Sequence, residues 1–323
     1  MWLSILVLFG FNLLTISSVS PENLAKQIFA WAIGLGLFFV GRQLNLYQLH
    51  RYRHLLLIIS CVLILLPILL NQITRGSRRW IDIGPISFQP SEISKPLLMA
   101  NISYQQMPLL HLIPVLLISL QPDLGSAISV FALLIPLVIV NKKYLITGII
   151  SISIFLLLSP VAYHYLLHPY QQNRLTQFLN PASDPKGQGY NVIQSKIAIG
   201  SGGLFGRGYR KGSQGQLLFL PEKHTDFIFA ATAEERGFIG IVAIIFCYYL
   251  LIKSLIVKAL VNSKPIYTVF TLGIAIQIWF QVTINIGMNL GLLPVTGIPL
   301  PFLSVGGSSI MALLFSLGII HST

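Results

Sequence analysis

Residues 1–20, MWLSILVLFGFNLLTISSVS, contain no charged side chain. A helix of about 20 apolar residues is long enough to cross the hydrocarbon core of a bilayer. Further apolar runs follow along the chain, without the alternation of apolar and polar residues that is typical of a membrane β-barrel. Because backbone groups inside lipid must be hydrogen-bonded within the protein, only helices remain. The sequence therefore predicts an all-α integral membrane protein.

The composition supports this class. Of the 323 residues, 54% are hydrophobic and only 9% are charged, whereas a soluble domain carries roughly 25% charged residues. The formal net charge is +12, which on a soluble protein would suggest nucleic acid as a partner. Here the basic residues lie in loops beside a membrane. We therefore expect anionic lipid headgroups and lipid-linked phosphates as partners, and no nucleic acid.

We predict about ten transmembrane helices in a single polytopic membrane domain that covers residues 1–323. Their approximate bounds are 1–20, 27–46, 52–70, 92–104, 107–121, 123–141, 144–168, 226–252, 266–290 and 301–320. The fourth and fifth are short, and short segments tend to lie near binding sites in membrane proteins. The first has no basic residue before its apolar stretch, so we interpret it as a retained span rather than a secretory signal.

Basic residues predict the orientation of the spans, since cytoplasmic loops are rich in Lys and Arg. The loops after the second, sixth and eighth spans are the more basic ones, which places both termini in the cytoplasm. They contain Arg42, Arg51, Arg53, Lys142, Lys143, Lys253, Lys258 and Lys264. A long loop at 169–225 then lies outside the cell. Loops of this length are usually functional or disordered, and its apolar residues favour a partly packed structure.

Acidic residues are rare in this chain, which contains nine. Those that touch predicted spans are Glu92, Asp123, Asp226, Glu234 and Glu235. A charge at bilayer depth is costly, so such residues face the protein interior and usually serve a function. The alternative for each is a structural ion pair.

Two of these acids have evident local explanations. Glu92 and Lys95 are three residues apart on one helix face and can neutralise each other. The same pair would also suit a pocket for a charged headgroup. Asp123 follows Pro122, a pattern typical of a helix start, so a capping role and a ligand role are equally supported.

Asp226 follows the polar segment 221–225 and opens an apolar helix at the predicted outer interface. It could cap that helix, but a half-buried carboxylate beside a cationic loop is also well placed as a general base. We favour the base. Glu234 and Glu235 are expected roughly 12 Å deeper along the same helix, in a structural network in which Arg236 neutralises one of them.

The histidines and glycines exclude some chemistries. His224 adjoins the candidate base and is a candidate for substrate binding. No pair of histidines has the HExxH spacing of a zinc site, and no Walker-type or dinucleotide-binding glycine motif is present. The sequence therefore argues against a dedicated zinc site and against ATP-driven transport.

Several segments resemble the SEDS family of shape, elongation, division and sporulation proteins. They begin with Arg79-Trp80-Ile81, Gln89-Pro90-Ser91-Glu92 with Lys95, and Gln121-Pro122-Asp123-Leu124-Gly125. They continue with Ala198-Ile199-Gly200-Ser201-Gly202-Gly203, Phe219-Leu220-Pro221-Glu222-Lys223-His224-Thr225-Asp226, Leu293-Pro294-Val295-Thr296-Gly297 and Gly306-Gly307-Ser308-Ser309. The matching segments span about 75–309 in the family's order. Two departures are Arg236, where the family is usually apolar, and Val305, where tyrosine is common.

The resemblance implies a ten-span peptidoglycan glycosyltransferase in the bacterial cytoplasmic membrane. Its substrates would be lipid II, a disaccharide-pentapeptide on undecaprenyl pyrophosphate, and the nascent lipid-linked glycan. Its partners would be a class B penicillin-binding protein and other membrane proteins of the elongation complex. Asp226 matches the essential aspartate of the family, whereas Glu92, Lys95 and Asp123 match residues that line the central cavity. Arg79 and Trp80 match an external motif.

The implied reaction fits these residues. Asp226 would accept the proton of the acceptor 4-hydroxyl, a role usually worth about 10²–10⁴-fold in rate. The reaction inverts the anomeric configuration, so one general base suffices and no covalent intermediate is needed. Basic side chains, or a divalent cation such as Mg²⁺ or Mn²⁺, must stabilise the departing pyrophosphate. Our candidates for that role are Arg79, Lys95, Arg210 and Lys211. Lys223, His224 and Thr225 complete the candidate substrate-binding set.

Three alternatives remain open. The segment Gly212-Ser213-Gln214 favours the elongation branch of the family, but the division branch has the same chemistry and usually carries alanine at the position of Lys223. A lipid II flippase would use the same cavity without a base, so it should tolerate Asp226→Asn. A non-catalytic scaffold should tolerate substitutions at Glu92, Lys95 and Asp123.

Overall fold

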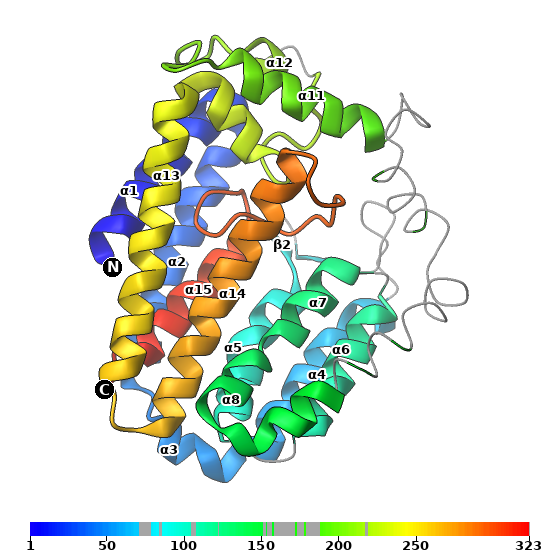
Figure 1. The fold of residues 1–323 in the computed structure, drawn as a ribbon, viewed down its shortest axis with the longest axis vertical. Helices are drawn as coiled ribbons and strands as arrows, with labels where there is room; N and C mark the ends of the chain where they lie inside the picture. Colours follow the sequence, from blue (N-terminus) through cyan, green and yellow to red (C-terminus); the bar gives the residue numbers. More distant parts are fainter. Residues whose placement is uncertain are drawn as a thin grey trace. The chain divides into compact units, whose positions relative to one another are not determined.

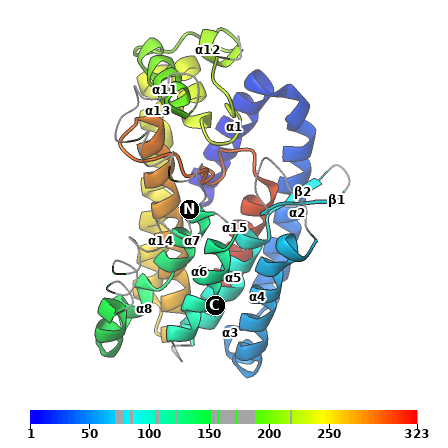
Figure 2. The same ribbon diagram turned by 90° about the vertical axis from the view of Figure 1, so that its right-hand side faces the viewer.

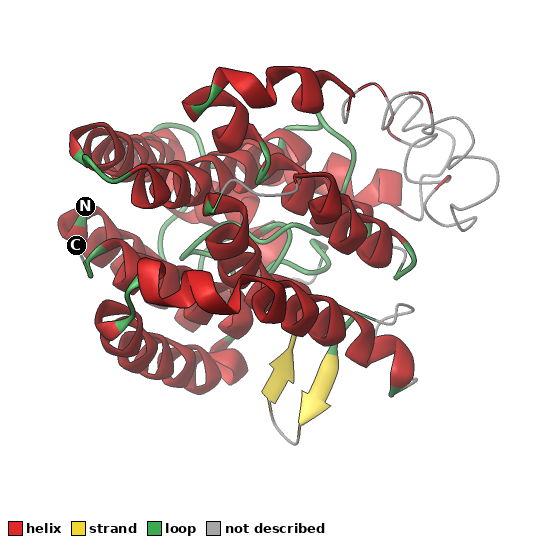
Figure 3. Ribbon diagram, turned by 90° about the horizontal axis from the view of Figure 1, so that it is seen from below, coloured by secondary structure: helices red, strands yellow, loops and turns green. Residues whose placement is uncertain are grey.

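The computed structural model describes residues 1–70, 79–83, 86–104, 108–121, 123–150, 188–216 and 219–322, with residues 153, 157, 172 and 178. This part of the chain is mostly helical, with loops between the helices and one small hairpin (Figure 3). The predicted all-α class is therefore confirmed. The hairpin was not predicted, because each of its strands is only three residues long.

Five described helical segments are long and apolar enough to cross a membrane, which identifies an integral membrane protein. They are Trp2–Val19, Pro21–Gln43, Leu46–Leu69, Ile228–Val261 and Pro265–Asn289. Shorter apolar helices lie at Leu109–Ser119, Leu124–Val140 and Gly307–Ile320. The predicted span 144–168 lies largely outside the described residues, so the number of ten spans stays a prediction.

The chain divides into two compact units. The first comprises Met1–Ile28, His168–Lys253 and Trp279–Gly306, and the second comprises Phe29–Leu167, Ser254–Ile278 and Gly307–Thr323. Helices α2 (Leu24–Gln43), α13 (Ile228–Val261) and α14 (Pro265–Asn289) each contribute residues to both units. Both units contain candidate residues of the functional site.

The first unit contains α1 (Trp2–Val19), α11 (Gln188–Ser201) and α12 (Ser213–Gln216). Helices α11 and α12 fall within the segment predicted as a long loop (Figure 1). A buried apolar cluster joins α1 and α11 to α13 and α14. Its members are Val19, Ala198, Leu220, Phe227, Ala230, Ala231, Met288 and Val295. This cluster fixes the start of α13, which Asp226 precedes by two residues.

Helix α13 is two helices joined at Gly237, which has φ 67° and ψ −167°. A Cβ at this position would lie 2.2 Å from the backbone nitrogen of Gly206, so only glycine fits. The glycine-rich segment 202–208 satisfies both helix ends at the kink. Glu234 O and Glu235 O accept from Arg207 N (2.9 Å) and Gly208 N (3.1 Å), and Phe238 N donates to Gly203 O (2.9 Å). Such partners are what buried helix ends require.

The second unit contains α4 (Arg53–Leu69), α5 (Pro90–Ser103), α6 (Leu112–Ser119), α7 (Leu124–Ala132), α8 (Ile135–Val140) and α15 (Gly307–Ile320). Strands β1 (Ile81–Ile83) and β2 (Ile86–Phe88) are antiparallel, with Asp82 opposite Ser87. Strand β2 leads directly into α5, as Figure 2 shows. In the sequence, the hairpin therefore lies between Arg79 and the polar start of α5.

Candidate functional site

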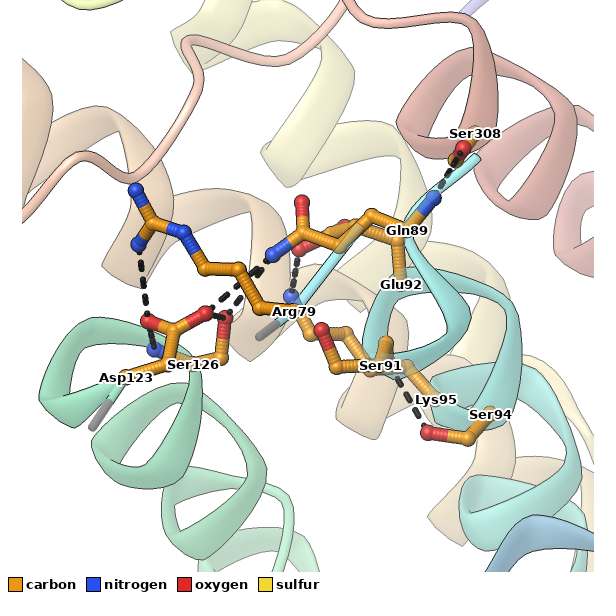
Figure 4. Close-up of polar contacts among 9 residues, drawn as sticks. All are labelled: Arg79, Gln89, Ser91, Glu92, Ser94, Lys95, Asp123, Ser126 and Ser308. Atoms are coloured by element: carbon orange, nitrogen blue, oxygen red, sulfur yellow. Dashed lines mark hydrogen bonds and ion pairs between the residues drawn. The ribbon is translucent and has the colours of Figure 1, made fainter. Parts of the chain in front are cut away.

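The predicted site residues form two groups, one in each unit. Figure 4 shows the group of the second unit, which contains Arg79, Glu92, Lys95 and Asp123. Trp80, also in this unit, is half-buried immediately before β1. The first unit contains Asp226 and the candidates Arg210, Lys211, Lys223, His224 and Thr225.

Asp123 has one of the two roles that its sequence context left open, the cap of a helix, while its role as a ligand stays a prediction. It is the N-cap of α7, where its carboxylate accepts from Ser126 N (3.1 Å) and Ser126 Oγ (2.8 Å). The same carboxylate pairs with the Arg79 guanidinium at 3.5 Å and accepts from Gln89 Nε2 at 3.2 Å. Asp123 is buried and the Arg79 side chain is 17% exposed. The capping role is thus joined by an ion pair that leaves part of the cation accessible.

Glu92 and Lys95 form the predicted ion pair, which is confirmed. Lys95 Nζ lies 2.5 Å from Glu92 Oε1, and both residues are buried. The other carboxylate oxygen of Glu92 is buried without a hydrogen-bond partner among the described residues, as are the hydroxyls of Ser91 and Ser309. Buried polar groups normally have a partner. This pair therefore has remaining capacity for a polar ligand or for water.

Asp226 lies two residues before α13 and is partly exposed. Its backbone carbonyl accepts hydrogen bonds from Asn289 Nδ2 (3.0 Å) and Asn285 Nδ2 (3.2 Å), both on α14. The preceding carbonyls are held too, because Thr225 O accepts from Ser304 Oγ (2.6 Å) and His224 O accepts from Val305 N (2.9 Å). Three consecutive carbonyl groups are therefore held at Asp226, which is partly exposed.

The polar turn before Asp226 is strained and internally bonded. Glu222 has a positive φ of 49°, which is uncommon for a residue other than glycine. Its carboxylate accepts from Thr225 Oγ1 at 2.8 Å. Lys223 Nζ donates to Gly215 O at 2.5 Å. Burial lowers the pKa of the Lys223 ammonium below its usual value, and the carboxylates of Glu22 and Glu235 partly oppose that shift.

Arg210 and Lys211 are exposed cations of the segment between α11 and α12. Arg210 has φ 58°, and its guanidinium donates to Ser17 O at 2.9 Å, at the end of α1. The guanidinium also lies over the ring of Tyr209, 5.4 Å from its centroid. Arg210 is thus held in place with its charge still in contact with solvent.

Glu234 and Glu235 lie in a hydrogen-bonded network, as the sequence predicted. Glu234 accepts from Gln214 N (2.9 Å), Gly215 N (3.1 Å) and Ser213 Oγ (3.2 Å), all at α12. Glu235 accepts from the Ser18 hydroxyl. The predicted structural network is present, but no ion pair joins Arg236 to either glutamate among the described residues. The start of α12 and the Ser18 hydroxyl at the end of α1 supply these partners.

The whole chain resembles one protein family. The model of the FtsW/RodA/SpoVE family, described as cell cycle proteins, matches residues 2–323. The chain belongs to this family. Peptidoglycan glycosyltransferase MrdB of Escherichia coli strain K12 is 38% identical, in an alignment that covers 100% of this chain and 92% of MrdB.

Solved structures of family members have the same fold. A structure described as showing structural coordination of polymerization and crosslinking by a peptidoglycan synthase complex contains a chain with 34% identity. The TM-score is 0.80, covering 98% of this chain and 94% of that one. The crystal structure of the Thermus thermophilus rod shape determining protein RodA has 28% identity and a TM-score of 0.71, covering 99% and 94%.

Sequence reasoning missed several polar residues of this family member. Gln89 and Ser126 share Asp123, and Ser304, Asn285 and Asn289 hold the backbone at 225–226. Asn285 and Asn289 are completely buried, four residues apart on a membrane-length helix. Uncharged polar side chains of this kind often join helices in membranes. The spacing could have been noticed, but the partner, Asp226 O, lies 59 and 63 residues away in sequence.

Proposed function

We propose that this chain polymerises lipid II into glycan strands, with Asp226 as the general base. The chain is a peptidoglycan glycosyltransferase of the FtsW/RodA/SpoVE family, as its similarity to MrdB along its whole length indicates. One structural observation carries the assignment of Asp226: its backbone is fixed by α14 while its side chain remains partly exposed. A general base needs both a set position and access to the proton that it accepts.

The proposed reaction is a single nucleophilic displacement at the anomeric carbon. The 4-hydroxyl oxygen of the acceptor sugar attacks the anomeric carbon of the lipid-linked glycan and forms the new glycosidic bond. The bond from that carbon to the pyrophosphate oxygen breaks, and undecaprenyl pyrophosphate leaves with the electron pair. Asp226 takes the hydroxyl proton. The attack inverts the anomeric carbon, so a single carboxylate is sufficient.

The departing pyrophosphate needs positive charge around it. Arg210 and Lys211 are the strongest candidates of the first unit, because both are exposed. In the second unit, Arg79 keeps partial exposure beside Asp123, whereas Lys95 is fully buried and paired with Glu92. We therefore assign Arg79 to direct phosphate contact and Lys95 to holding Glu92 and the polar groups around it.

A divalent cation could also neutralise the phosphates. Within the part of the chain that the structure describes, no three His, Cys, Asp or Glu side chains gather as metal ligands. Mg²⁺ commonly binds through one or two carboxylates together with substrate phosphates, so Mg²⁺ or Mn²⁺ carried by the substrate stays a prediction.

The proposed setting is the outer face of the bacterial cytoplasmic membrane, with both termini in the cytoplasm. The likeness to a chain of a peptidoglycan synthase complex supports a crosslinking partner, which we take to be a class B penicillin-binding protein. The likeness to MrdB and to a rod shape determining protein favours a role in elongation over division.

The proposal is tested by incubating the purified full chain, with and without its partner, with labelled lipid II. We expect glycan polymer from the native protein and none from Asp226→Ala. Equal polymer from both proteins would remove Asp226 from this role. A parallel assay of lipid II translocation in sealed vesicles tests the flippase alternative, which requires translocation that survives Asp226→Asn.

A further inference from the structure

We propose that Asn285 and Asn289 are positioning residues that hold Asp226 in its reactive place. The inference rests on the proposed function, because it concerns the base of that reaction. Both asparagines are completely buried on α14. Each donates a side-chain N–H to the backbone carbonyl of Asp226, from 3.2 Å and 3.0 Å respectively.

Asn289 also fixes the first turn of α13. Its Oδ1 accepts from Ala230 N at 3.2 Å, while its Nδ2 donates to Asp226 O. The first backbone N–H groups of a helix have no partner inside the helix and need one from elsewhere. One amide side chain therefore joins the Asp226 carbonyl, just before the helix, to the first turn within it.

The orientation of the Asn289 amide is set by its partners. If its oxygen and nitrogen exchanged places, an oxygen would face Asp226 O and an NH₂ group would face Ala230 N–H. Ser195 on α11 supports the observed arrangement, since its hydroxyl donates to Asn289 O at 2.8 Å and to Asn289 Oδ1 at 3.3 Å. The Asn289 side chain thus has little freedom to rotate.

Asn285 extends the arrangement to the segment after α14. Its Nδ2 donates to Ile298 O at 2.9 Å as well as to Asp226 O. The backbone carbonyl oxygen of Asn285 accepts from Asn289 Nδ2 at 2.8 Å. Asp226 is consequently tied to two buried amides that are themselves tied to α11, α13 and the segment at 298.

A pair that only stabilised the fold would lower protein stability and leave the turnover of the folded protein unchanged. A pair that positions the base should lower kcat, because a displacement of about 1 Å can cost about 100-fold in rate. KM should change little, because neither asparagine contacts the lipid-linked sugars in this proposal. The split between kcat and KM therefore separates the two roles.

The experiment measures lipid II polymerisation by the full chain with its partner, for Asn285→Leu, Asn289→Leu, Asp226→Asn and wild type. Leucine shares the branching of asparagine at Cγ, is larger in volume and cannot donate a hydrogen bond. We expect kcat to fall about 10- to 100-fold in each asparagine variant, with KM within about threefold. Ser195→Ala should have a smaller effect of the same kind.

Met288→Ala is the matched control. Met288 is buried beside Asn289, belongs to the apolar cluster and makes no hydrogen bond to Asp226. It should lower the melting temperature while kcat per folded molecule stays within about twofold. Asparagine variants that keep wild-type kcat, or whose kcat falls only as it does in Met288→Ala, would overturn the inference.

A double variant separates this inference from the proposed function. In an Asp226→Asn background, Asn289→Leu should cause no further loss of residual polymerisation, because residues that act through one group are not additive. An additional tenfold loss would contradict a role through Asp226. If Asp226→Asn itself polymerises at the native rate, the proposed base is wrong and the inference built on it falls too.

Discussion

The acids Asp226 and Glu92 are held in opposite ways in the two units. Glu92 is buried, and its charge is balanced by Lys95 at 2.5 Å. Asp226 is partly exposed, and its peptide group is held by the neutral amides of Asn285 and Asn289. In one region the side chain is fixed by a charge, and in the other the backbone is fixed by amides.

This difference suggests that Glu92 contributes to the stability of the protein and Asp226 to its reaction. The Glu92 carboxylate is paired with a buried lysine, so it serves the structure of the site. Asp226 is partly exposed, so its carboxylate can reach the proton of a substrate. We therefore expect substitutions at Lys95 to unfold the protein and substitutions at Asp226 to stop the reaction.

The largest effect on stability is expected at Lys95. Lys95→Met leaves the buried Glu92 charge without its partner and should cost about 3–5 kcal/mol. The double variant Glu92→Gln with Lys95→Met should recover most of that loss, since no buried charge remains. Thermal unfolding in detergent measures both. If Lys95→Met unfolds at the native temperature, the pair does not hold this region together.

An intermediate effect on stability is expected at Glu234. In the first unit this charged side chain anchors the segment at α12. In the native protein Gln214 N and Gly215 N donate to the Glu234 carboxylate. Glu234→Gln keeps the shape of the side chain but weakens these two hydrogen bonds, because the negative charge is lost. Bonds to charged groups are worth about 1.5–3 kcal/mol each. Amide hydrogen exchange should rise in 208–216 and remain unchanged in α5. Unchanged exchange in 208–216 would show that Glu234 does not anchor it.

The smallest effect on stability is expected at Arg79. Its distance of 3.5 Å to Asp123 and its partial exposure indicate an ion pair worth about 1 kcal/mol or less. Asp123 also keeps its bonds from Ser126 and Gln89. Arg79→Gln should therefore unfold near the native temperature but bind lipid II more weakly. A loss of stability comparable to Lys95→Met would place Arg79 among the buried structural charges.

Much of the architecture could be predicted because apolar runs of membrane length decide between helix and strand. The pair of Glu92 and Lys95 could be predicted too, since both lie on one helix three residues apart. The kink of α13 could not, because Gly237 lacks local signals that distinguish a tight backbone contact with Gly206 from an ordinary helical glycine. The kink at Gly237 depends on its contact with the segment at 204–206, which is distant in the sequence.

The acidic residues of the candidate site could be predicted from the sequence, but most residues that hydrogen-bond to them could not. The motif around Asp226 pointed to a base because of the cationic segment before it. Asn285 and Asn289 gave no comparable signal, because their role depends on the packing of α14 against the start of α13 in the first unit. Glu234 and Glu235 were placed in a network, but without the kink their partners at α12 and α1 could not be named.

The account depends most directly on the proton that Asp226 accepts. The decisive measurement compares wild type and Asp226→Asn for lipid II binding and for the single-turnover rate of glycosidic bond formation. Asparagine preserves the shape of the side chain and the hydrogen bonds to the backbone carbonyl. We predict binding within about threefold and a rate lower by at least about 100-fold. A rate within threefold of wild type would contradict the role of Asp226 as the general base.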